Sequence, residues 1–252
     1  MRETKVDQLT VRVYPTRLDM GQAAAQDGLA KLRTLLKQKE QVNVVFAAAP
    51  SQSEMLETLT AARDIDWQRV HAFHMDNYIG LPQDAQQQFS TFLKDRLFNK
   101  LPFGAVHLMG NTPADAENYA QLLREHPLDI CFLGIGENGH IAFNDPGVAD
   151  FDDPYLVKMV ELDEVCRNQQ VNDGCFETLS QVPTHALTMT IPAMVAAKHM
   201  ICTVPGKSKA WAVREMLTQV PSSQLPATVL RRHTDSVLYI DQDAAALWEA
   251  QA

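Results

Sequence analysis

The sequence contains no apolar run long enough to cross a membrane. A membrane-spanning helix needs about 20 consecutive, mostly apolar residues, and no stretch of this 252-residue chain approaches that length. The segment 1–7 also lacks the apolar core that a secretory signal requires. We therefore expect a cytoplasmic protein that has no membrane partner.

Paired cysteines and an excess of basic residues are also missing. The four cysteines form no Cys-x-x-Cys pair and two lie within apolar runs, which indicates small buried side chains rather than a metal site or disulfide framework. The net charge of −9 argues against a nucleic-acid partner, because phosphate backbones require a basic surface. A small phosphorylated ligand stays compatible with this charge, since a local cluster of donors is enough to bind it.

The sequence shows no internal repeat, low-complexity tract or Gly/Ser-rich linker that would mark a domain boundary. A length of 252 residues is long for one domain but within the range of single α/β domains. We therefore expect residues 1–252 to form one domain.

What the sequence does contain is an alternation of strand-like and helix-like segments. Near-continuous apolar runs predict buried strands at 42–47, 70–75, 128–133, 200–204 and 237–240. Helices are expected at 21–36, from about residue 50, at 89–97, 114–124 and 191–197, from about residue 210, and at 244–252. Ser51 and Glu54 have the spacing of a capping box. The alternation predicts a three-layer α/β/α fold with a mostly parallel, Rossmann-like sheet covered by helices on both faces.

Residues 134–145 read Gly-Ile-Gly-Glu-Asn-Gly-His-Ile-Ala-Phe-Asn-Asp and directly follow the predicted strand 128–133. Gly136 and Gly139 allow a tight turn and a close approach of backbone amides to a ligand. His140 supplies a side chain whose unperturbed pKa is near neutral. A nearby carboxylate would fix its tautomer and leave the other ring nitrogen for substrate. The alternative is a loop histidine that only satisfies a backbone carbonyl.

Cofactor and metal motifs are not convincing in this chain. The three glycines of this loop match the Gly-x-Gly-x-x-Gly pattern of dinucleotide-binding proteins, but they lie mid-chain and the following residues do not resemble the start of a helix. The remaining histidines, including His71, His74, His185 and His233, show no ligand spacing such as His-Glu-x-x-His. We therefore expect neither an organic cofactor nor a metal ion.

Polar residues follow four of the predicted strands: Ser51, Asp76, the loop 134–145 and Lys209. Because ligands bind beyond the carboxyl ends of parallel strands, these positions should converge on one cleft. Ser51 and Gln52 open a helix whose free amides favour an anion, and Lys209 adds an ammonium group. Asp76 lies beside aromatic and apolar residues, an environment that raises a carboxyl pKa and suits proton transfer.

Each of these positions has a plainer alternative. Ser51 can serve only as a helix cap, Asp76 as a turn aspartate and Lys209 as a surface lysine. The expected convergence of all four segments favours the functional interpretation.

Four motifs carry a family resemblance: Phe-His-Met-Asp-Asn-Tyr-Ile-Gly-Leu at 73–81, the run 134–146, Val-Pro-Thr-His-Ala-Leu-Thr at 182–188, and Gly-Lys-Ser-Lys-Ala at 206–210. With them the chain resembles, over nearly its whole length, the glucosamine-6-phosphate deaminase family, within the wider group that includes 6-phosphogluconolactonase. The resemblance implies a hydrolase/isomerase that converts glucosamine 6-phosphate into fructose 6-phosphate and ammonia without metal or cofactor.

The resemblance also implies residue roles. Asp76 matches the base that moves a proton between carbons 2 and 1 of the opened sugar. His140 matches the group that opens the pyranose ring, and Asp145 the acid that polarises this histidine. Lys209 matches a phosphate ligand, and the loop with Ser51 and Gln52 contributes to the same phosphate site.

Several positions depart from the family pattern. Asn138 stands where many members have aspartate, Asp145 is one methylene shorter than the usual glutamate, and Asn77 replaces an acid. An arginine that helps to hold phosphate is replaced near Asn172, and Arg167 is expected to compensate in part.

These departures leave the substrate open between glucosamine 6-phosphate and galactosamine 6-phosphate. 6-Phosphogluconolactonase is a weaker alternative, because its Asp-Glu-Arg and Gly-His-Thr-Ala-Ser-Leu-Phe motifs are missing. A protein that binds a sugar phosphate without turning it over is a third alternative. Whether the chain forms a homo-oligomer is not decided by the sequence.

Overall fold

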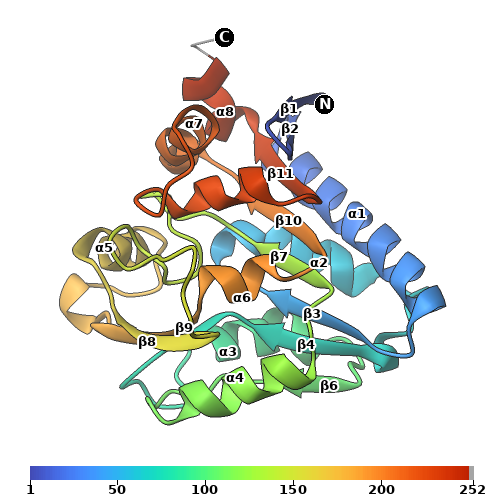
Figure 1. Ribbon diagram of the computed structural model, residues 1–252, viewed down its shortest axis with the longest axis vertical. Helices are drawn as coiled ribbons and strands as arrows, with labels where there is room; N and C mark the ends of the chain where they lie inside the picture. The colour runs from blue at the N-terminus through green and yellow to red at the C-terminus, as the bar shows by residue number, and fades with distance from the viewer. Residues whose placement is uncertain (250–252) are drawn as a thin grey trace.

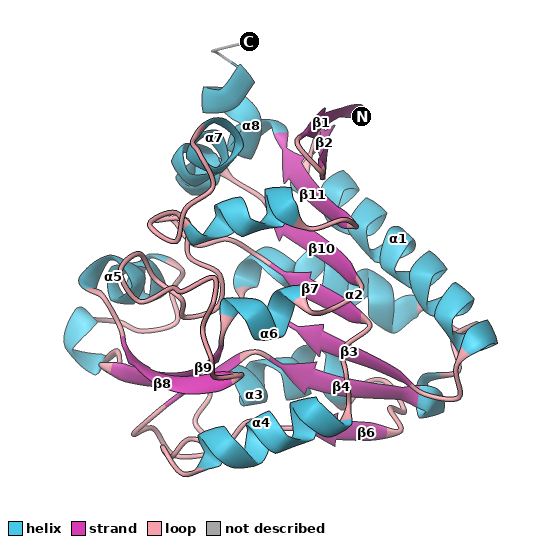
Figure 2. Ribbon diagram, in the orientation of Figure 1, coloured by secondary structure: helices cyan, strands magenta, loops and turns pink. Residues whose placement is uncertain are grey.

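The computed structural model describes residues 1–249, and an eight-stranded sheet runs through its centre (Figures 1 and 2). The strand order is β1-β2-β11-β10-β7-β3-β4-β6, and every neighbouring pair is parallel except the β1–β2 hairpin. The strands are β1 (Arg2–Val6), β2 (Leu9–Tyr14), β3 (Val42–Phe46), β4 (Val70–His74), β6 (Ala105–His107), β7 (Ile130–Leu133), β10 (His199–Val204) and β11 (Ser236–Asp241).

The five expected strands correspond to β3, β4, β7, β10 and β11, whereas β1, β2 and β6 were not predicted. Differences in burial explain why β2 and β6 were missed. All residues of β3 and β7 are buried, because helices cover both faces of the sheet there. In β2 only alternate residues are buried, and β6 has three residues, none of them buried. Neither pattern gives the continuous apolar run from which the other strands were predicted.

Helices cover both faces of this sheet and form the outer layers (Figure 1). One hydrophobic core lies under α1 (Arg17–Gln38), α2 (Ser53–Ala61) and α3 (Phe89–Leu93), which a π-helical turn, η3 (Lys94–Phe98), extends. The other core lies under the helices of the opposite face: α4 (Asp115–Glu125), α6 (Ile191–Val195), α7 (Ala210–Thr218) and α8 (Gln242–Glu249). The expected three-layer α/β/α fold is therefore confirmed. The end of the expected C-terminal helix, 250–252, lies outside the described residues.

A second, three-stranded antiparallel sheet was not expected. It has the order β5-β9-β8 and consists of β5 (Asp76–Tyr78), β8 (Val157–Glu161) and β9 (His185–Met189). The region 145–182, which looked irregular in sequence, contributes β8 and α5 (Glu164–Asn172). Because β5 begins two residues after β4 ends, the chain crosses from the main sheet to the small one at Met75 and carries Asp76 to the junction.

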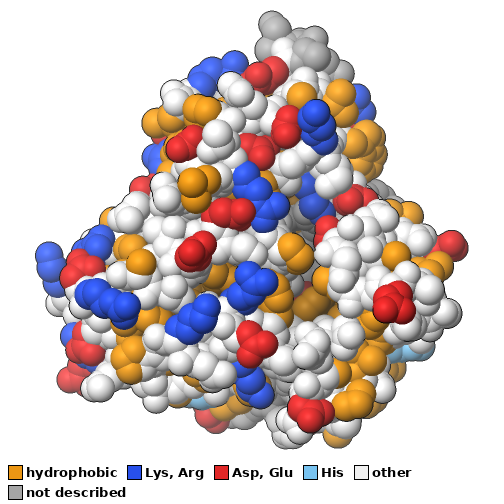
Figure 3. Space-filling model, turned by 180° about the vertical axis from the view of Figure 1, so that it is seen from behind, with side chains coloured by type: hydrophobic (Ala, Val, Ile, Leu, Met, Phe, Trp, Pro, Cys, Tyr) orange, Lys and Arg blue, Asp and Glu red, His pale blue; other side chains and the backbone are white. Residues whose placement is uncertain are grey.

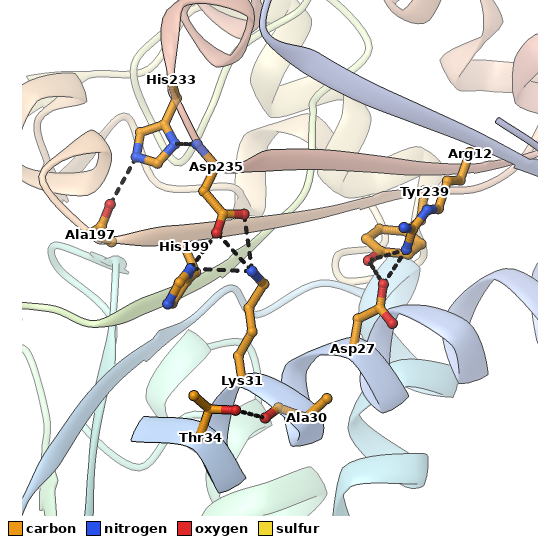
Figure 4. A network of polar contacts seen from close by, with 10 residues as sticks. All are labelled: Arg12, Asp27, Ala30, Lys31, Thr34, Ala197, His199, His233, Asp235 and Tyr239. Carbon is orange, nitrogen blue, oxygen red and sulfur yellow. Dashed lines mark hydrogen bonds and ion pairs between the residues drawn. The ribbon is translucent and has the colours of Figure 1, made fainter. Parts of the chain in front are cut away.

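Polar contacts tie α1 to the sheet at the edge where the parallel strands begin (Figure 4). Lys31 Nζ donates to both carboxylate oxygens of Asp235, at 3.0 and 2.8 Å, and Nδ1 of His199 lies 2.6 Å from the same carboxylate. Nearby, Arg12 and Tyr239 both donate to Asp27. The loops that follow the parallel strands lie at the opposite edge of the sheet and are not involved in these contacts.

No helix within residues 1–249 combines the length and hydrophobicity of a membrane span. On the face seen in Figure 3, positive and negative side chains are interspersed rather than gathered by sign. That face therefore offers charges of both signs to a partner.

Candidate active site

A cavity of about 500 Å³ opens where the parallel strands end. Its wall includes residues 47–51 after β3, 75–76 after β4, 134–136 after β7 and 205–206 after β10. These four strands are neighbours in the sheet, so their carboxyl ends meet at one edge. The structure thus brings Ser51, Asp76, Gly136, His140 and Lys209 to the same cavity.

Asp76 is buried at the start of β5, with 6% of its surface exposed, yet it reaches the cavity wall. Burial raises its pKa to about 8, because an apolar environment disfavours the carboxylate. A carboxyl group with a pKa in this range can accept and return a proton near neutral pH.

His74 holds the backbone of Asp76 in place. Its Nδ1 donates to the carbonyl oxygen of Asp76 at 2.9 Å, and its Nε2 accepts from the backbone N–H of Met109 at 2.8 Å. Burial lowers the pKa of His74 to about 4, so the ring is neutral and can donate at one nitrogen while accepting at the other. The histidine of the Phe-His-Met-Asp motif therefore positions the aspartate.

His140 is oriented by two side chains at one ring nitrogen. Its Nδ1 lies 2.7 Å from Oδ1 of Asn138 and 3.0 Å from Oδ1 of Asp145. Both are acceptors, which places the proton on Nδ1 and leaves a lone pair on Nε2. Because His140 lines the cavity, this lone pair can take a proton from a bound ligand.

Asp145 is completely buried behind His140. Burial alone would raise its pKa, but hydrogen bonds from His140 and Asn138 outweigh it and the pKa is lowered. The group is therefore an ionised carboxylate that holds the ring and stabilises a charged imidazolium. Neither Asp145 nor Asn138 lines the cavity, so both act through His140.

Asn138 uses both ends of its side-chain amide. Its Nδ2 donates to Asp145 at 3.0 Å, and its Oδ1 accepts from the backbone N–H of His140 as well as from the ring. An ionised aspartate at 138 could not donate to Asp145. The amide at 138, which departs from the family pattern, therefore complements the shorter side chain of Asp145 by donating a hydrogen bond to it.

Three backbone features shape this loop. A Cβ on Gly136 would lie 2.1–2.3 Å from ring atoms of His140, so only glycine lets the ring pack against the chain. Gly139 has a φ of +85°, which makes the turn before the histidine, and it does not line the cavity. Ala142 lines the cavity with a φ of +52°, a strained conformation for a residue with a Cβ.

Two further residues of the cavity lining, Lys209 and Ser51, carry groups that interact favourably with anions. Lys209 lies in the 3-10 turn η5 (Lys207–Lys209) before α7 and is 5% exposed. Burial lowers its pKa, while the carboxylates of Asp173 and Glu137 act in the opposite direction. Ser51 lies in the corresponding turn before α2, η1 (Pro50–Gln52). An ammonium and a hydroxyl at the starts of two helices are groups of the kind that bind anions.

Gln52 is a positioning residue rather than a ligand in this structure. It is fully buried and does not line the cavity. Its amide donates to Ser51 Oγ at 3.1 Å and to the carbonyl oxygen of Thr203 at 3.2 Å. The Ser51 hydroxyl accepts this bond and keeps its own proton for a ligand. The expected capping box is wrong, because α2 starts at Ser53 without a side-chain cap.

Arg167, expected to compensate for a missing phosphate arginine, is placed elsewhere. Its Nη2 donates to the carbonyl oxygens of Leu179 and Val182, both at 2.9 Å, and the residue lines a separate, shallower groove. That expectation is corrected, because the guanidinium is bound to these two carbonyl oxygens and Arg167 does not line the cavity. Asn77 also has a structural task, since its amide donates to the carbonyl oxygen of Met109 at 3.1 Å.

Two charged residues of the cavity lining were not found from the sequence. Arg17 opens α1 and bonds to Glu54 at 2.6 Å and to the carbonyl oxygen of Pro50, which places a guanidinium beside Ser51. The sequence signal that could have revealed Arg17 is the alternation of apolar residues in β2. A strand at 9–14 places residues 15–17 beyond its carboxyl end, where ligands bind. Asp173 brings a carboxylate to the cavity lining from the end of α5, where no strand precedes it.

The family of the chain follows from sequence comparison. The family described as glucosamine-6-phosphate isomerases/6-phosphogluconolactonase matches residues 15–239. The chain belongs to this family. A glucosamine-6-phosphate deaminase of Bacillus cereus (strain B4264) is 35% identical over 227 residues, which cover 88% of this chain and 84% of that protein. A glucosamine-6-phosphate deaminase of Exiguobacterium sp. (strain ATCC BAA-1283 / AT1b) is 37% identical over 186 residues, 72% of this chain and 71% of that protein.

Solved structures agree with this family assignment. A monomeric glucosamine-6-phosphate deaminase superposes with a TM-score of 0.85 at 28% identity, covering 94% of this chain and 99% of the other. A 6-phosphogluconolactonase from Thermotoga maritima superposes with a TM-score of 0.74 at 21% identity, covering 92% of this chain and 99% of the other. The second likeness is one of fold alone.

Proposed function

We propose that this chain is a glucosamine-6-phosphate deaminase, which isomerises and deaminates glucosamine 6-phosphate to fructose 6-phosphate and ammonia. The observation that carries the proposal is the placement of Asp76, His140 and Lys209 in the lining of one cavity. Two proton-transfer groups and an anion site are what an aldose–ketose isomerisation of a sugar phosphate requires.

His140 opens the sugar ring in the proposed reaction. Its Nε2 lone pair accepts the proton of the hydroxyl on carbon 1 and returns it to the ring oxygen, which breaks the bond between that oxygen and carbon 1. Asp145 and Asn138 keep the ring in one tautomer and stabilise the charge that it carries between the two transfers.

Asp76 then moves a proton from carbon 2 to carbon 1. The carboxylate takes the proton from carbon 2 of the open chain, and the resulting acid delivers it to carbon 1, so no net proton is consumed. The raised pKa favours the second half of this cycle, because a carboxylic acid that holds its proton near neutral pH can also donate it.

Release of ammonia completes the reaction. The proton shift from carbon 2 to carbon 1, together with transfer of one proton from the ammonium group to the carbonyl oxygen of carbon 1, leaves a carbon–nitrogen double bond at carbon 2. Addition of water and loss of ammonia then give the ketone. The overall change is therefore hydrolytic at nitrogen and isomerising at carbon, and none of its steps requires a metal or an organic cofactor.

The phosphate is held by Lys209, the Ser51 hydroxyl and the amides of the two turns, with Arg17 beside them. In the same proposal, residues 1–252 act as one catalytic domain, and a cytoplasmic location stays a prediction.

The test is a product assay on the purified chain with glucosamine 6-phosphate, galactosamine 6-phosphate and 6-phosphogluconolactone. We expect equal amounts of ammonia and fructose 6-phosphate from the first substrate. Saturable binding of glucosamine 6-phosphate without turnover would replace the proposal by a binding protein, and faster hydrolysis of the lactone would replace it by a lactonase.

A further inference from the structure

Three histidines from separate elements meet outside the catalytic cavity. His71 lies near the start of β4, His107 ends β6 and His126 follows the last residue of α4. These elements lie side by side at one edge of the main sheet (Figure 1). One nitrogen of each ring lies within 4.8 Å of one nitrogen of each of the others. All three rings are partly exposed, and none lines the cavity.

The spacing of the rings matches that around a tetrahedral metal ion. A zinc ion with nitrogen ligands at about 2.1 Å holds the ligand nitrogens about 3.4 Å apart and the imidazole centres about 5.3 Å apart. Nε2 of His107 lies 3.4 Å from Nδ1 of His71. The ring centres are 5.2 Å apart for His107 and His126, 5.5 Å for His71 and His107, and 5.6 Å for His71 and His126.

Neighbouring side chains hold two of these rings in place. Phe73 stacks on His107 with ring centres 4.4 Å apart. The side-chain amide of Gln41 lies 3.2 Å from Nδ1 of His126. The stacking fixes the plane of the His107 ring, as neighbouring contacts do at metal sites. Binding of an ion requires the Gln41 amide to release Nδ1 of His126, because a neutral ring that accepts at this nitrogen carries its proton on the other. The change needed at His126 is thus local to the Gln41 amide, while the His107 ring is already held by Phe73.

We propose that His71, His107 and His126 form a binding site for one divalent transition-metal ion, with Zn²⁺ as the preferred ion. Three imidazoles with a water as the fourth ligand are a known zinc arrangement, and the partial exposure of the rings leaves room for that water. The ion would fasten the end of α4 to the strands β4 and β6. The proposal is independent of the sugar-phosphate chemistry and departs from the sequence-based expectation of no metal.

The test is calorimetric titration of Zn²⁺ into the chelator-treated full chain. We expect one equivalent to bind. The variants His71→Gln and His126→Gln should each weaken binding at least about tenfold, as loss of a metal-orienting or metal-ligating group does. His185→Gln is the matched control, because this partly exposed histidine lies outside the cluster. Circular dichroism of each variant checks that it is folded.

Zinc could also bind at a second cluster, so variants of both clusters are compared. His140, Asp145 and Cys166 also lie within 4.8 Å of one another. Zinc affinity that survives in Cys166→Ala but falls in His126→Gln supports the proposal. Affinity that falls in Cys166→Ala but survives in both histidine variants overturns it, and so does the absence of zinc binding by the unaltered chain.

Discussion

The side-chain amide of Asn138 donates a hydrogen bond to Asp145 at 3.0 Å, and this contact links two departures from the family pattern. The shorter acid at 145 and the amide at 138 complement each other, because the amide supplies a proton that a second carboxylate lacks. Both side chains meet Nδ1 of His140, so the orientation of the ring depends on the pair.

Replacing Asn138 with aspartate should destabilise the fold. Asn138→Asp exchanges a hydrogen bond for two carboxylates in contact, which we expect to lower the free energy of unfolding by about 1–3 kcal/mol near neutral pH. Repulsion raises the pKa of one carboxyl, and protonation restores a donor, so the loss should shrink as the pH falls. Urea unfolding at neutral and acidic pH measures it, and an equal loss at both would contradict this explanation.

Removing the charge of Asp76 should stabilise the protein in alkaline solution. The folded-state pKa of about 8 lies above the ordinary value of 3.8, so the folded protein binds the proton more tightly and loses stability as the pH rises between these values. Asp76→Asn avoids this penalty, and we expect a gain of about 2–5 kcal/mol above pH 8 with almost none at pH 4. Thermal unfolding across this range tests it, and a pH-independent effect would refute it.

Lys209 should contribute to substrate binding through the phosphate. Lys209→Met removes a buried cation from the cavity, and we expect the affinity for glucosamine 6-phosphate to fall by about 10–100-fold. Lys207→Met is the matched control, since Lys207 is exposed and does not line the cavity. Calorimetry with both variants tests the assignment, and equal losses would show that only overall charge matters.

The contact between Lys31 and Asp235 predicts a modest stability effect that acid removes. Burial alone would raise the pKa of Asp235, but hydrogen bonds from Lys31 and His199 outweigh it and the pKa is lowered. Stability from this group is therefore present above its unfolded-state pKa and lost as the pH falls through the folded-state pKa. Because the Asp235 side chain is 38% exposed, we expect Asp235→Asn to cost only about 0.5–1 kcal/mol at neutral pH. A cost that persists in strong acid would exclude this origin.

The fold could be predicted where burial leaves a simple pattern. Strands β3 and β7 are covered on both faces and read as apolar runs, whereas β2 is covered on one face and the three strands of the second sheet alternate with polar residues or are short. The polar residues after strands β3, β4, β7 and β10 were found because parallel strands end at one edge. Arg17 was missed because its strand was missed.

Side-chain direction and distant contacts could not be predicted in the same way. Arg167 and Asp173 both belong to the α5 region, and packing sends one to a separate groove and the other to the cavity. The cluster of His71, His107 and His126 combines residues from three elements, so no local spacing announces it. Pairwise complementarity such as that of Asn138 and Asp145 also becomes visible only in three dimensions.

The central claim is that Asp76 is the proton-transfer base of an amino-sugar-phosphate deaminase. The most direct test measures ammonia release and binding of glucosamine 6-phosphate by the unaltered chain and by Asp76→Asn. We predict that the unaltered chain releases ammonia, and that the variant binds the sugar phosphate with similar affinity but releases ammonia at least about a thousandfold more slowly, because it has lost the base. Near-normal release by the variant would contradict the account.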